Sequence, residues 1–227
     1  HGSAYRSFGA EVTVIEAMPD ILGSELPDAA ARVRRGLEER GMRFLCGSPV
    51  ERVERSGDGL RVITAGGSVE ADAVLAAVGR RPRLDGIDAA ALGLATERGA
   101  IVTDGHMRTS VPHIYAIGDV IYKNTQLAHF ATAQGFHVVE KLSGIEPKTD
   151  LSIVPAVLYT VPELAQVGKT EQDLEKEGIE YDKAKSMYQA NGKALAVGGT
   201  KGFIKILSTK DHKKILGCHI IGKDADL

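Results

Sequence analysis

One acidic residue stands where an α/β sheet can bind a sugar. Glu16 closes the short β-branched run 11–16, and the breaker Pro19 follows it. In a Rossmann half-domain, an acid at the carboxyl end of such a strand accepts hydrogen bonds from the hydroxyls of an adenosine ribose. The same carboxylate would repel a 2′-phosphate, which favours NAD over NADP. A solvated glutamate at a strand end gives the same pattern, and no glycine fingerprint precedes Glu16.

Two glycines and a helix start lie where further strands are expected to end. Gly79 closes a continuous apolar run, and a residue without a Cβ lets a nucleotide approach closely. Asp119 follows Gly118 at the end of a second run, where its carboxylate can bind a sugar or polyol hydroxyl. Residues 126–129 begin an expected helix whose first backbone N–H groups can face an electron-rich ligand atom. The alternatives are a turn glycine, a structural Gly-Asp turn and a surface or capping His129.

The elements that position these residues follow an α/β order. The patterns predict strands at 11–16 and 42–47, separated by an amphipathic helix that starts near Pro27 and stops at Gly41. A strand, helix, strand order favours a parallel sheet with a right-handed crossover. From Val50 onward, alternating apolar and polar residues broken by SGDG and AGG predict antiparallel hairpins.

Two more strands and a helix are expected before the chain changes character. The continuous apolar runs 72–79 and 113–119 predict strands that are covered on both faces. A helix is expected from near Gln126. Between residues 143 and 152, Gly, Pro, Lys and Asp interrupt the apolar rhythm and indicate a domain boundary.

Beyond this boundary the pattern predicts an α+β unit. Its last two strands flank the polar turn STKDHKK, which is a hairpin signal. The expected strands are 154–159, 181–188, 202–207 and 215–221, and the expected helix is 171–177.

Composition excludes several classes of protein. The 227 residues carry 28 basic and 30 acidic side chains, and a net charge of −2 supplies no basic field for a nucleic acid. No apolar run approaches the roughly 18 residues of a membrane-spanning helix. Cys46 and Cys218 have neither a CxxC nor a metal-ligand spacing, and the histidines show no HxxxH or HxH pattern, so no metal site is expected. Hydrolase and kinase motifs are absent from the sequence.

A series of sequence blocks, taken together, resembles one family. The blocks are VTVIE, LAAVGRRP, TSVPHIYAIGDV, QLAHFATAQG, VPAVLYTVPELAQVGKTE, YQANGKALAVGGTKGFIKIL and ILGCHIIG. In this order and spacing they are similar to the class I flavoprotein pyridine nucleotide-disulfide oxidoreductases, and most of all to the branch that oxidises dihydrolipoamide. The resemblance covers the chain from about Ala4.

The resemblance implies a fold with α/β and α+β parts. We expect partial Rossmann-like NAD(P)- and FAD-binding domains followed by a truncated α+β dimerisation (interface) domain. Residues 1–80 would form an NAD-binding domain that lacks its first strand and glycine loop. Residues 81–149 would form the second part of the FAD-binding or central domain, and residues 150–227 the N-terminal part of the dimerisation domain.

By motif, the resemblance implies contacts with two cofactors, NAD and FAD. Glu16 would bind the NAD ribose, Val50 would lie near the adenine, and Gly79 would line the same pocket. Asp119 would hold the ribityl chain of FAD. Backbone N–H groups of the QLAH segment would stabilise the negative charge that develops on the flavin ring when it is reduced. The residues of that segment are Gln126, Leu127, Ala128 and His129.

The resemblance also indicates which parts of the family's machinery these 227 residues do not contain. The family passes electrons from dihydrolipoamide through a redox-active disulfide and FAD to NAD⁺, and a His–Glu pair acts as the base. Neither the CxxxxC disulfide, the GxGxxG of the FAD half nor the His–Glu pair occurs in this sequence. No catalytic residue is therefore expected here, and Cys46 and Cys218 are assigned no catalytic role.

Two functional hypotheses follow. In the first, the chain is an internal fragment of an FAD-dependent, NAD-linked enzyme that oxidises dihydrolipoamide to lipoamide, and the fragment alone is inactive. The resemblance then implies a homodimer, lipoyl domains of 2-oxoacid dehydrogenase or glycine cleavage complexes as partners, and a location in the cytoplasm, or in the mitochondrial matrix of a eukaryote. In the second, the chain is a non-catalytic assembly or nucleotide-binding module. Mercuric and glutathione reductases share the scaffold, but Glu16 argues against an NADP enzyme.

Overall fold

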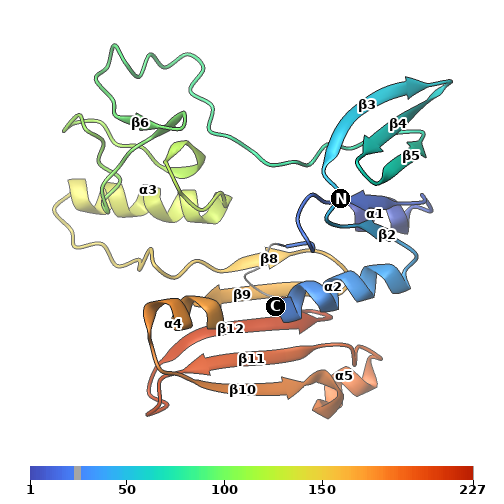
Figure 1. Ribbon diagram of the computed structural model, residues 1–227. Helices are drawn as coiled ribbons and strands as arrows, with labels where there is room; N and C mark the ends of the chain where they lie inside the picture. Colours follow the sequence, from blue (N-terminus) through green and yellow to red (C-terminus); the bar gives the residue numbers. More distant parts are fainter. Residues whose placement is uncertain (23–26, 227) are drawn as a thin grey trace. The chain divides into compact units, whose positions relative to one another are not determined.

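The polypeptide folds into two units. The computed structural model describes residues 1–22 and 27–226. Unit 1 consists of His1–Leu75 together with the chain from Pro155 onward, and unit 2 is Ala76–Val154 (Figure 1). Unit 1 therefore combines two segments that are separated in sequence by the whole of unit 2.

The first segment of unit 1 begins with a small parallel sheet. After the helix α1 (Gly2–Ser7), strand β1 (Thr13–Ile15) pairs in parallel with β2 (Arg43–Leu45), and the helix α2 (Pro27–Glu39) connects them. Residues 23–26, just before α2, lie outside the described residues. The predicted strand, helix, strand order and the parallel pairing are both confirmed.

A separate antiparallel sheet follows in the same segment. Its strands are β3 (Val50–Ser56), β4 (Gly59–Thr64) and β5 (Gly67–Ala71), paired in that order. The hairpins predicted from the alternating pattern are confirmed. Gly57, in the β3–β4 turn, has φ +59°, a conformation that favours glycine.

The second segment of unit 1 forms a five-stranded antiparallel sheet in the order β10-β11-β12-β9-β8. The helix α4 and four of the strands confirm the predicted elements to within a few residues, whereas β9 and the short helices η2 and α5 were not predicted. The elements are β8 (Ala156–Leu158), β9 (Glu163–Gly168), α4 (Glu171–Glu177), β10 (Asp182–Met187), η2 (Tyr188–Ala190), α5 (Gly192–Ala196), β11 (Phe203–Ser208) and β12 (Ile215–Gly222).

One apolar core joins the two segments of unit 1. Val33 and Leu37 of α2 are buried together with Phe203 of β11 and Ile221 of β12. The helix contacts β9 and β12, and Figure 1 shows it lying along this sheet. The apolar stripe predicted for α2 therefore packs against a sheet formed more than 120 residues later in the chain.

Unit 2 contains little regular structure. Its elements are the short strands β6 (Thr96–Glu97) and β7 (Ala100–Ile101), the 3₁₀ turn η1 (Gly118–Val120) and the helix α3 (Ala128–Leu142). A core holds them together, and α3 contributes Val138 to it. The buried residues of this core are Leu94, Ile101, Met107, Ala116, Ile121 and Val138.

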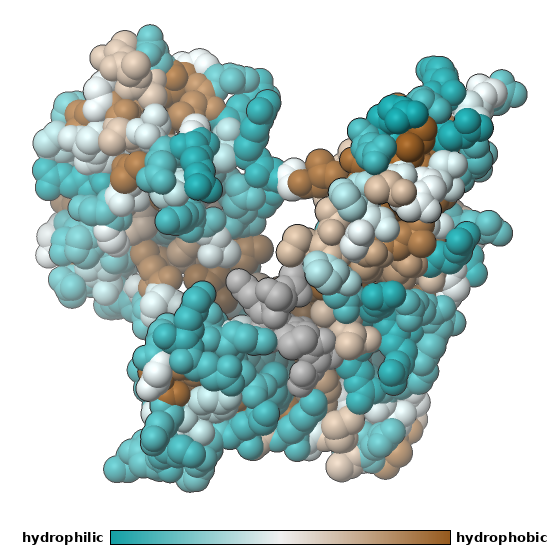
Figure 2. Space-filling model, in the orientation of Figure 1, coloured by the Kyte–Doolittle hydropathy of each residue, from teal (hydrophilic) through white to brown (hydrophobic). Residues whose placement is uncertain are grey.

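Two predicted strands are wrong. Residues 72–79 pair with no strand in the described chain, and without a ladder a β conformation leaves its backbone groups unpaired. Their side chains are exposed, Val78 to 95%, and Figure 2 shows hydrophobic atoms along this segment. Residues 113–119 make one bridge, between Tyr115 and Arg108, and then turn into η1. Both runs are apolar enough for a buried strand, but neither has a partner strand among residues 1–22 and 27–226.

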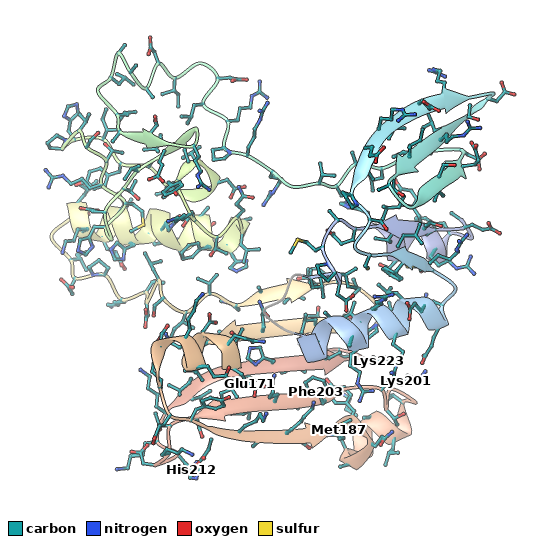
Figure 3. The ribbon with its side chains drawn as sticks, viewed as in Figure 1. Glu171, Met187, Lys201, Phe203, His212 and Lys223 are labelled. Atoms are coloured by element: carbon teal, nitrogen blue, oxygen red, sulfur yellow. The ribbon has the colours of Figure 1, made fainter. Side chains whose placement is uncertain are left out.

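A partly buried ionic group lies between α4 and the five-stranded sheet. Lys205 of β11 is 4% exposed and donates to Glu171 of α4 at 2.7 Å, and Lys183 donates to the other carboxylate oxygen at 2.7 Å. Figure 3 labels Glu171 on α4. Burial raises the pKa of Glu171, but the hydrogen bonds from Lys183 and Lys205 outweigh it and lower the pKa to about 2. His219, opposite Lys205 on β12, is also buried, and its burial and the nearby Lys205 charge lower its pKa.

The shared core predicts a strong contrast between two isoleucines of one strand. Ile221 is fully buried and Ile215 is 64% exposed, and both lie on β12. We expect Ile221→Ala to lower the free energy of unfolding by about 2–5 kcal/mol because it leaves a cavity, and Ile215→Ala to change it by less than about 0.5 kcal/mol. Urea unfolding followed by far-UV circular dichroism measures both. Equal effects of the two substitutions would contradict the packing described here.

The ionic group predicts acid sensitivity of the sheet. A carboxylate whose pKa is lowered by folding stabilises the native state above its unfolded pKa, near 4.5, and this contribution is lost as the pH falls towards about 2. We expect Glu171→Gln to lower stability at pH 7, by at most about 3 kcal/mol, and the difference from the wild type to shrink between pH 5 and pH 2. Urea unfolding at several pH values measures this. Glu175→Gln, an exposed position on the same helix, is the control, and a pH-independent difference would contradict the prediction.

Candidate cofactor-binding site

In unit 1, backbone hydrogen bonds fix Glu16 directly after β1. Its N–H donates to the Leu45 carbonyl at 2.9 Å, and its carbonyl accepts from the Ser48 N–H at 3.0 Å. The two bonds extend the parallel pairing by one residue beyond Ile15. Glu16 therefore stands at the carboxyl end of a parallel strand, as predicted from the sequence.

The side chain of Glu16 is half-buried and partly engaged. One carboxylate oxygen, Oε1, accepts from the Met18 N–H at 2.8 Å. This bond orients the carboxylate and leaves the second oxygen able to accept from a diol. Val50, which begins β3, is 45% exposed and lies two residues after Ser48. The structure therefore brings Glu16 and Val50 into one neighbourhood of unit 1.

In unit 2, Asp119 lies in η1 next to a glycine that the geometry requires. Gly118 has φ +72°, and a Cβ built on it would lie 3.0 Å from the Cβ of Ala131 on α3. The turn can therefore approach the helix closely only because residue 118 is glycine. The side chain of Asp119 is 47% exposed, so its carboxylate is accessible to a ligand.

Arg80 connects Asp119 to the segment before α3. Its Nη1 lies 3.4 Å from Oδ2 of Asp119, and its Nη2 donates to the Gln126 carbonyl at 2.8 Å. Sequence reasoning missed Arg80, although it directly follows Gly79 in the block LAAVGRRP. The signal was available as a cation next to a candidate ligand-binding glycine, but its partners lie 39 and 46 residues further along the chain.

The helix α3 begins at Ala128, two residues later than predicted. Leu127 is its N-cap with an extended backbone and makes no side-chain cap hydrogen bond, and no acidic residue lies in the first turn. The amides of a first helical turn have no intrahelical acceptor, and the helix dipole is positive at this end. Gln126 and Leu127 therefore lead into this turn, which contains Ala128 and His129.

Gly79 lies in extended, exposed chain just before Arg80. Its φ of +117° is one that L-residues rarely adopt, and nothing lies within 4 Å of a Cβ built on it. The backbone conformation therefore favours glycine here, and the open space allows a ligand to approach.

The predicted site residues fall into two groups. Glu16 and Val50 belong to unit 1, whereas Gly79, Asp119 and the 126–129 segment belong to unit 2. Within unit 2, Arg80 ties the turn that carries Asp119 to the start of α3. That Gly79 lines the same pocket as Glu16 and Val50 concerns residues of different units, and it stays a prediction.

The described residues offer little support for a metal site or a reactive thiol. Among the described residues, no three or more His, Cys, Asp or Glu side chains are grouped as metal ligands. Cys46 and Cys218 are free, and burial raises the pKa of both thiols. A raised pKa disfavours the reactive thiolate.

The sequence of the chain matches one family of proteins. Residues 1–135 match the pyridine nucleotide-disulphide oxidoreductase family, and residues 154–227 match the dimerisation domain of the same family. The chain therefore belongs to the pyridine nucleotide-disulphide oxidoreductases, which are flavoprotein disulfide reductases, and it has the predicted mixed α/β and α+β fold.

Individual relatives narrow the comparison. The chain is 39% identical to dihydrolipoyl dehydrogenase of Cupriavidus necator, covering 99% of this chain and 48% of that protein, and 39% identical to mitochondrial dihydrolipoyl dehydrogenase 2 of Arabidopsis thaliana, covering 99% and 45%. It thus spans about half the length of the curated relatives that it matches.

Solved structures of similar fold also match this chain over about half of their own length. LpdA from Mycobacterium tuberculosis is 27% identical with a TM-score of 0.90, and the match covers 99% of this chain and 49% of that one. The HOCl-induced flavoprotein disulfide reductase RclA from Escherichia coli is 26% identical with a TM-score of 0.88, covering 99% and 52%. Over residues 1–22 and 27–226, no helix has the length and apolar character needed to cross a bilayer.

The close approach at Gly118 predicts a position-specific effect of alanine. Gly118 and Gly99 both have positive φ, +72° and +78°, but nothing lies within 4 Å of a Cβ at Gly99. We expect backbone strain to lower the free energy of unfolding of both alanine variants by about 1–2 kcal/mol. In Gly118→Ala the free energy of unfolding should fall by about 1–3 kcal/mol more, because the added methyl group presses on Ala131. Native-state hydrogen exchange of the α3 amides measures the difference, and equal losses would contradict the close approach.

Proposed function

We propose that this chain is part of an FAD-dependent enzyme that oxidises dihydrolipoamide to lipoamide with NAD⁺ as acceptor. The observation that carries the proposal is the arrangement in unit 2, where the accessible carboxylate of Asp119 and the uncapped start of α3 are connected through Arg80. The family and the dihydrolipoyl dehydrogenase relatives support it.

The residues of unit 2 fit a bound flavin. A polyol chain needs a hydrogen-bond acceptor that is not committed to a buried partner, and Asp119 is 47% exposed and paired with an exposed Arg80. Amides of the first turn of α3 can face an electron-rich flavin edge. When bound, FAD supplies the two-electron chemistry that connects a dithiol to a nicotinamide. The chain's own residues 119 and 126–129 would bind and orient it.

Glu16 fits the ribose of NAD. Two backbone hydrogen bonds hold Glu16 at the end of β1, and the Met18 N–H orients its carboxylate. There the carboxylate can accept from a ribose diol and repel a 2′-phosphate. Val50 would lie beside the adenine, and Gly79 would let the nucleotide approach the backbone.

The remaining assignments follow from the same proposal. Residues 1–80 would belong to the NAD-binding domain, residues 81–149 to the FAD-binding or central domain, and residues 150–227 to the dimerisation domain of a homodimer. Lipoyl domains of 2-oxoacid dehydrogenase or glycine cleavage complexes would be its partners, in the cytoplasm or in the mitochondrial matrix of a eukaryote. The chain would be inactive alone, because the disulfide and the His–Glu base are not among its residues.

The role of Glu16 predicts a selective kinetic defect. In the full-length protein that contains this chain, we expect Glu16→Gln to raise the KM for NAD⁺ about tenfold, because a charged acceptor for the ribose becomes neutral. The kcat and the KM for dihydrolipoamide should change less than about twofold, since binding of NAD⁺ alone is weakened. Steady-state NADH formation measures all three quantities.

Glu11→Gln, at an exposed position just before β1, is the matched control and should leave the KM for NAD⁺ unchanged. An unchanged KM in Glu16→Gln would exclude the ribose contact. A purified full-length protein with no flavin absorbance, or with no dihydrolipoamide-dependent NADH formation, would overturn the proposed function itself.

A further inference from the structure

Two amide side chains, the buried Gln134 and the half-buried Asn124, hold the turn that carries Asp119. We propose that Asn124 and Gln134 are positioning residues, which fix the Gly118–Asp119 turn and the start of α3 in the relative orientation that flavin binding requires. This inference rests on the proposed function, because it concerns how the same site is kept in shape.

The two amides contact both sides of Gly118. The Gly118 N–H donates to Oε1 of Gln134 at 2.8 Å, and Nδ2 of Asn124 donates to the Gly118 carbonyl at 2.8 Å. The amides also bind each other, Nε2 of Gln134 to Oδ1 of Asn124 at 2.9 Å and Nδ2 of Asn124 to Oε1 of Gln134 at 3.2 Å. We call the side chains of Asn124 and Gln134, bound to the backbone of Gly118, the amide clasp.

The backbone partners determine the orientation of each amide. A backbone N–H must meet an oxygen and a backbone carbonyl must meet a donor, so Gln134 presents Oε1 and Asn124 presents Nδ2 to Gly118. The remaining atoms of the two amides are then complementary to each other. Gln134 is 3% exposed, so an unmatched partner would be left without water to replace it. The clasp therefore has one arrangement.

This arrangement controls the next residue. The carbonyl of Gly118 belongs to the peptide that leads into Asp119, and Asn124 holds that peptide by its oxygen. Gln134 lies on α3, six residues after the helix begins, and the missing Cβ of Gly118 lets the turn lie against Ala131 of the same helix. The turn and the helix are thus joined at two points, which sets the carboxylate of Asp119 relative to the first turn of α3.

Arg80 cannot supply this positioning. Its side chain is 62% exposed, and an exposed ion pair holds its partner weakly and is screened by salt. The pair also uses the carboxylate that a polyol would need. The clasp binds the turn through the backbone N–H and carbonyl of Gly118, so it can orient Asp119 without competing for its carboxylate.

The test compares the clasp with a core substitution of similar cost to folding. In the full-length protein, Gln134→Leu removes an acceptor and a donor at nearly constant volume, and Val138→Ala reduces the core of unit 2 without removing a hydrogen bond to Gly118. Both lie on α3. The measurements are the dissociation constant of FAD from apoprotein, the vibronic structure of the flavin absorbance band, and the midpoint of thermal unfolding.

For Gln134→Leu we expect an FAD dissociation constant more than about tenfold higher, with a blurred flavin band, because the turn no longer has one orientation. For Val138→Ala we expect less than about a threefold change and a band like the wild type, even where the thermal midpoints fall equally. Gln134→Glu should rescue part of the loss, because a carboxylate still accepts from the Gly118 N–H and from Asn124.

Asn124 supplies a second, less buried variant that keeps the test decisive if Gln134→Leu does not fold. Asn124→Ala should also weaken FAD binding, and the Asn124→Ala, Gln134→Leu pair should be non-additive because both act on one peptide unit. Weakening of FAD binding that simply follows the thermal midpoint, in these variants and in Val138→Ala alike, would overturn the inference.

Asp119→Asn separates this failure from a failure of the proposed function. If Asp119→Asn weakens FAD binding and the clasp variants do not, the inference is wrong and the proposed function stands. If the full-length protein binds FAD equally well with Asp119→Asn, or does not bind it at all, the flavin site proposed here is wrong, and the clasp has no flavin to position.

Discussion

The burial of one helix between two sheets is the constraint on which unit 1 depends. The core around α2 contains Leu164, Phe203 and Ile221 of the five-stranded sheet, and Val14 and Phe44 of the parallel pair pack against it. A two-stranded parallel sheet is not stable by itself and needs cover. The helix can serve both sheets because its apolar side chains cover a broad stripe, so the start of the chain is folded by contacts with its end. The surface ion pair of Lys201 with Glu39 joins the same parts but is too exposed to contribute much.

This constraint extends to the candidate nucleotide site. Glu16 is placed by bonds to Leu45 and Ser48, which exist only while β1 and β2 remain paired. A loss of packing in the distant sheet would therefore reach the carboxylate through α2. In unit 2, the candidate carboxylate Asp119 is held in place in a different way. This unit has no large sheet to hold Asp119, and the hydrogen bonds of Gly118 with Gln134 and Asn124, together with the close approach at Gly118, take the place of a strand ladder.

The parts of the fold that could be predicted are those whose signal is local. The stripe of Val33 and Leu37, the turn at Gly57 and the helix 171–177 each lie within a few turns or one hairpin, so periodicity and turn chemistry suffice. Residues 72–79 and 113–119 failed because an apolar run shows only that a strand would be stable if a partner lay beside it. Strand β9 was missed for the complementary reason, since ELAQVG has a partner in β12 but little alternation of its own.

The same distinction explains the site. Glu16, Asp119 and the start of α3 could be proposed because a strand end, a Gly-Asp turn and a helix start are visible in the sequence. Arg80, Asn124 and Gln134 could not, because a polar residue gains its role from a partner that only the folded chain brings near. Asn124 and Gln134 look like ordinary residues of a loop and a helix until Gly118 is placed between them.

Two acids of this chain show how the surroundings of a carboxylate decide its use. Glu171 is bound by two lysines, one of them buried, and its pKa falls to about 2, so removing its carboxylate would take an opposite charge away from a buried lysine. Asp119 is half exposed and paired with an exposed arginine, and such a pair is worth about 0–1 kcal/mol. On the proposed function, a neutral hydroxyl would therefore replace Arg80 at little cost, whereas loss of the Glu171–Lys205 pair would be strongly destabilising. A carboxylate that binds a ligand has to be held firmly through its backbone and weakly through its charge, and these are the roles that we propose for the amide clasp and Arg80 at Asp119.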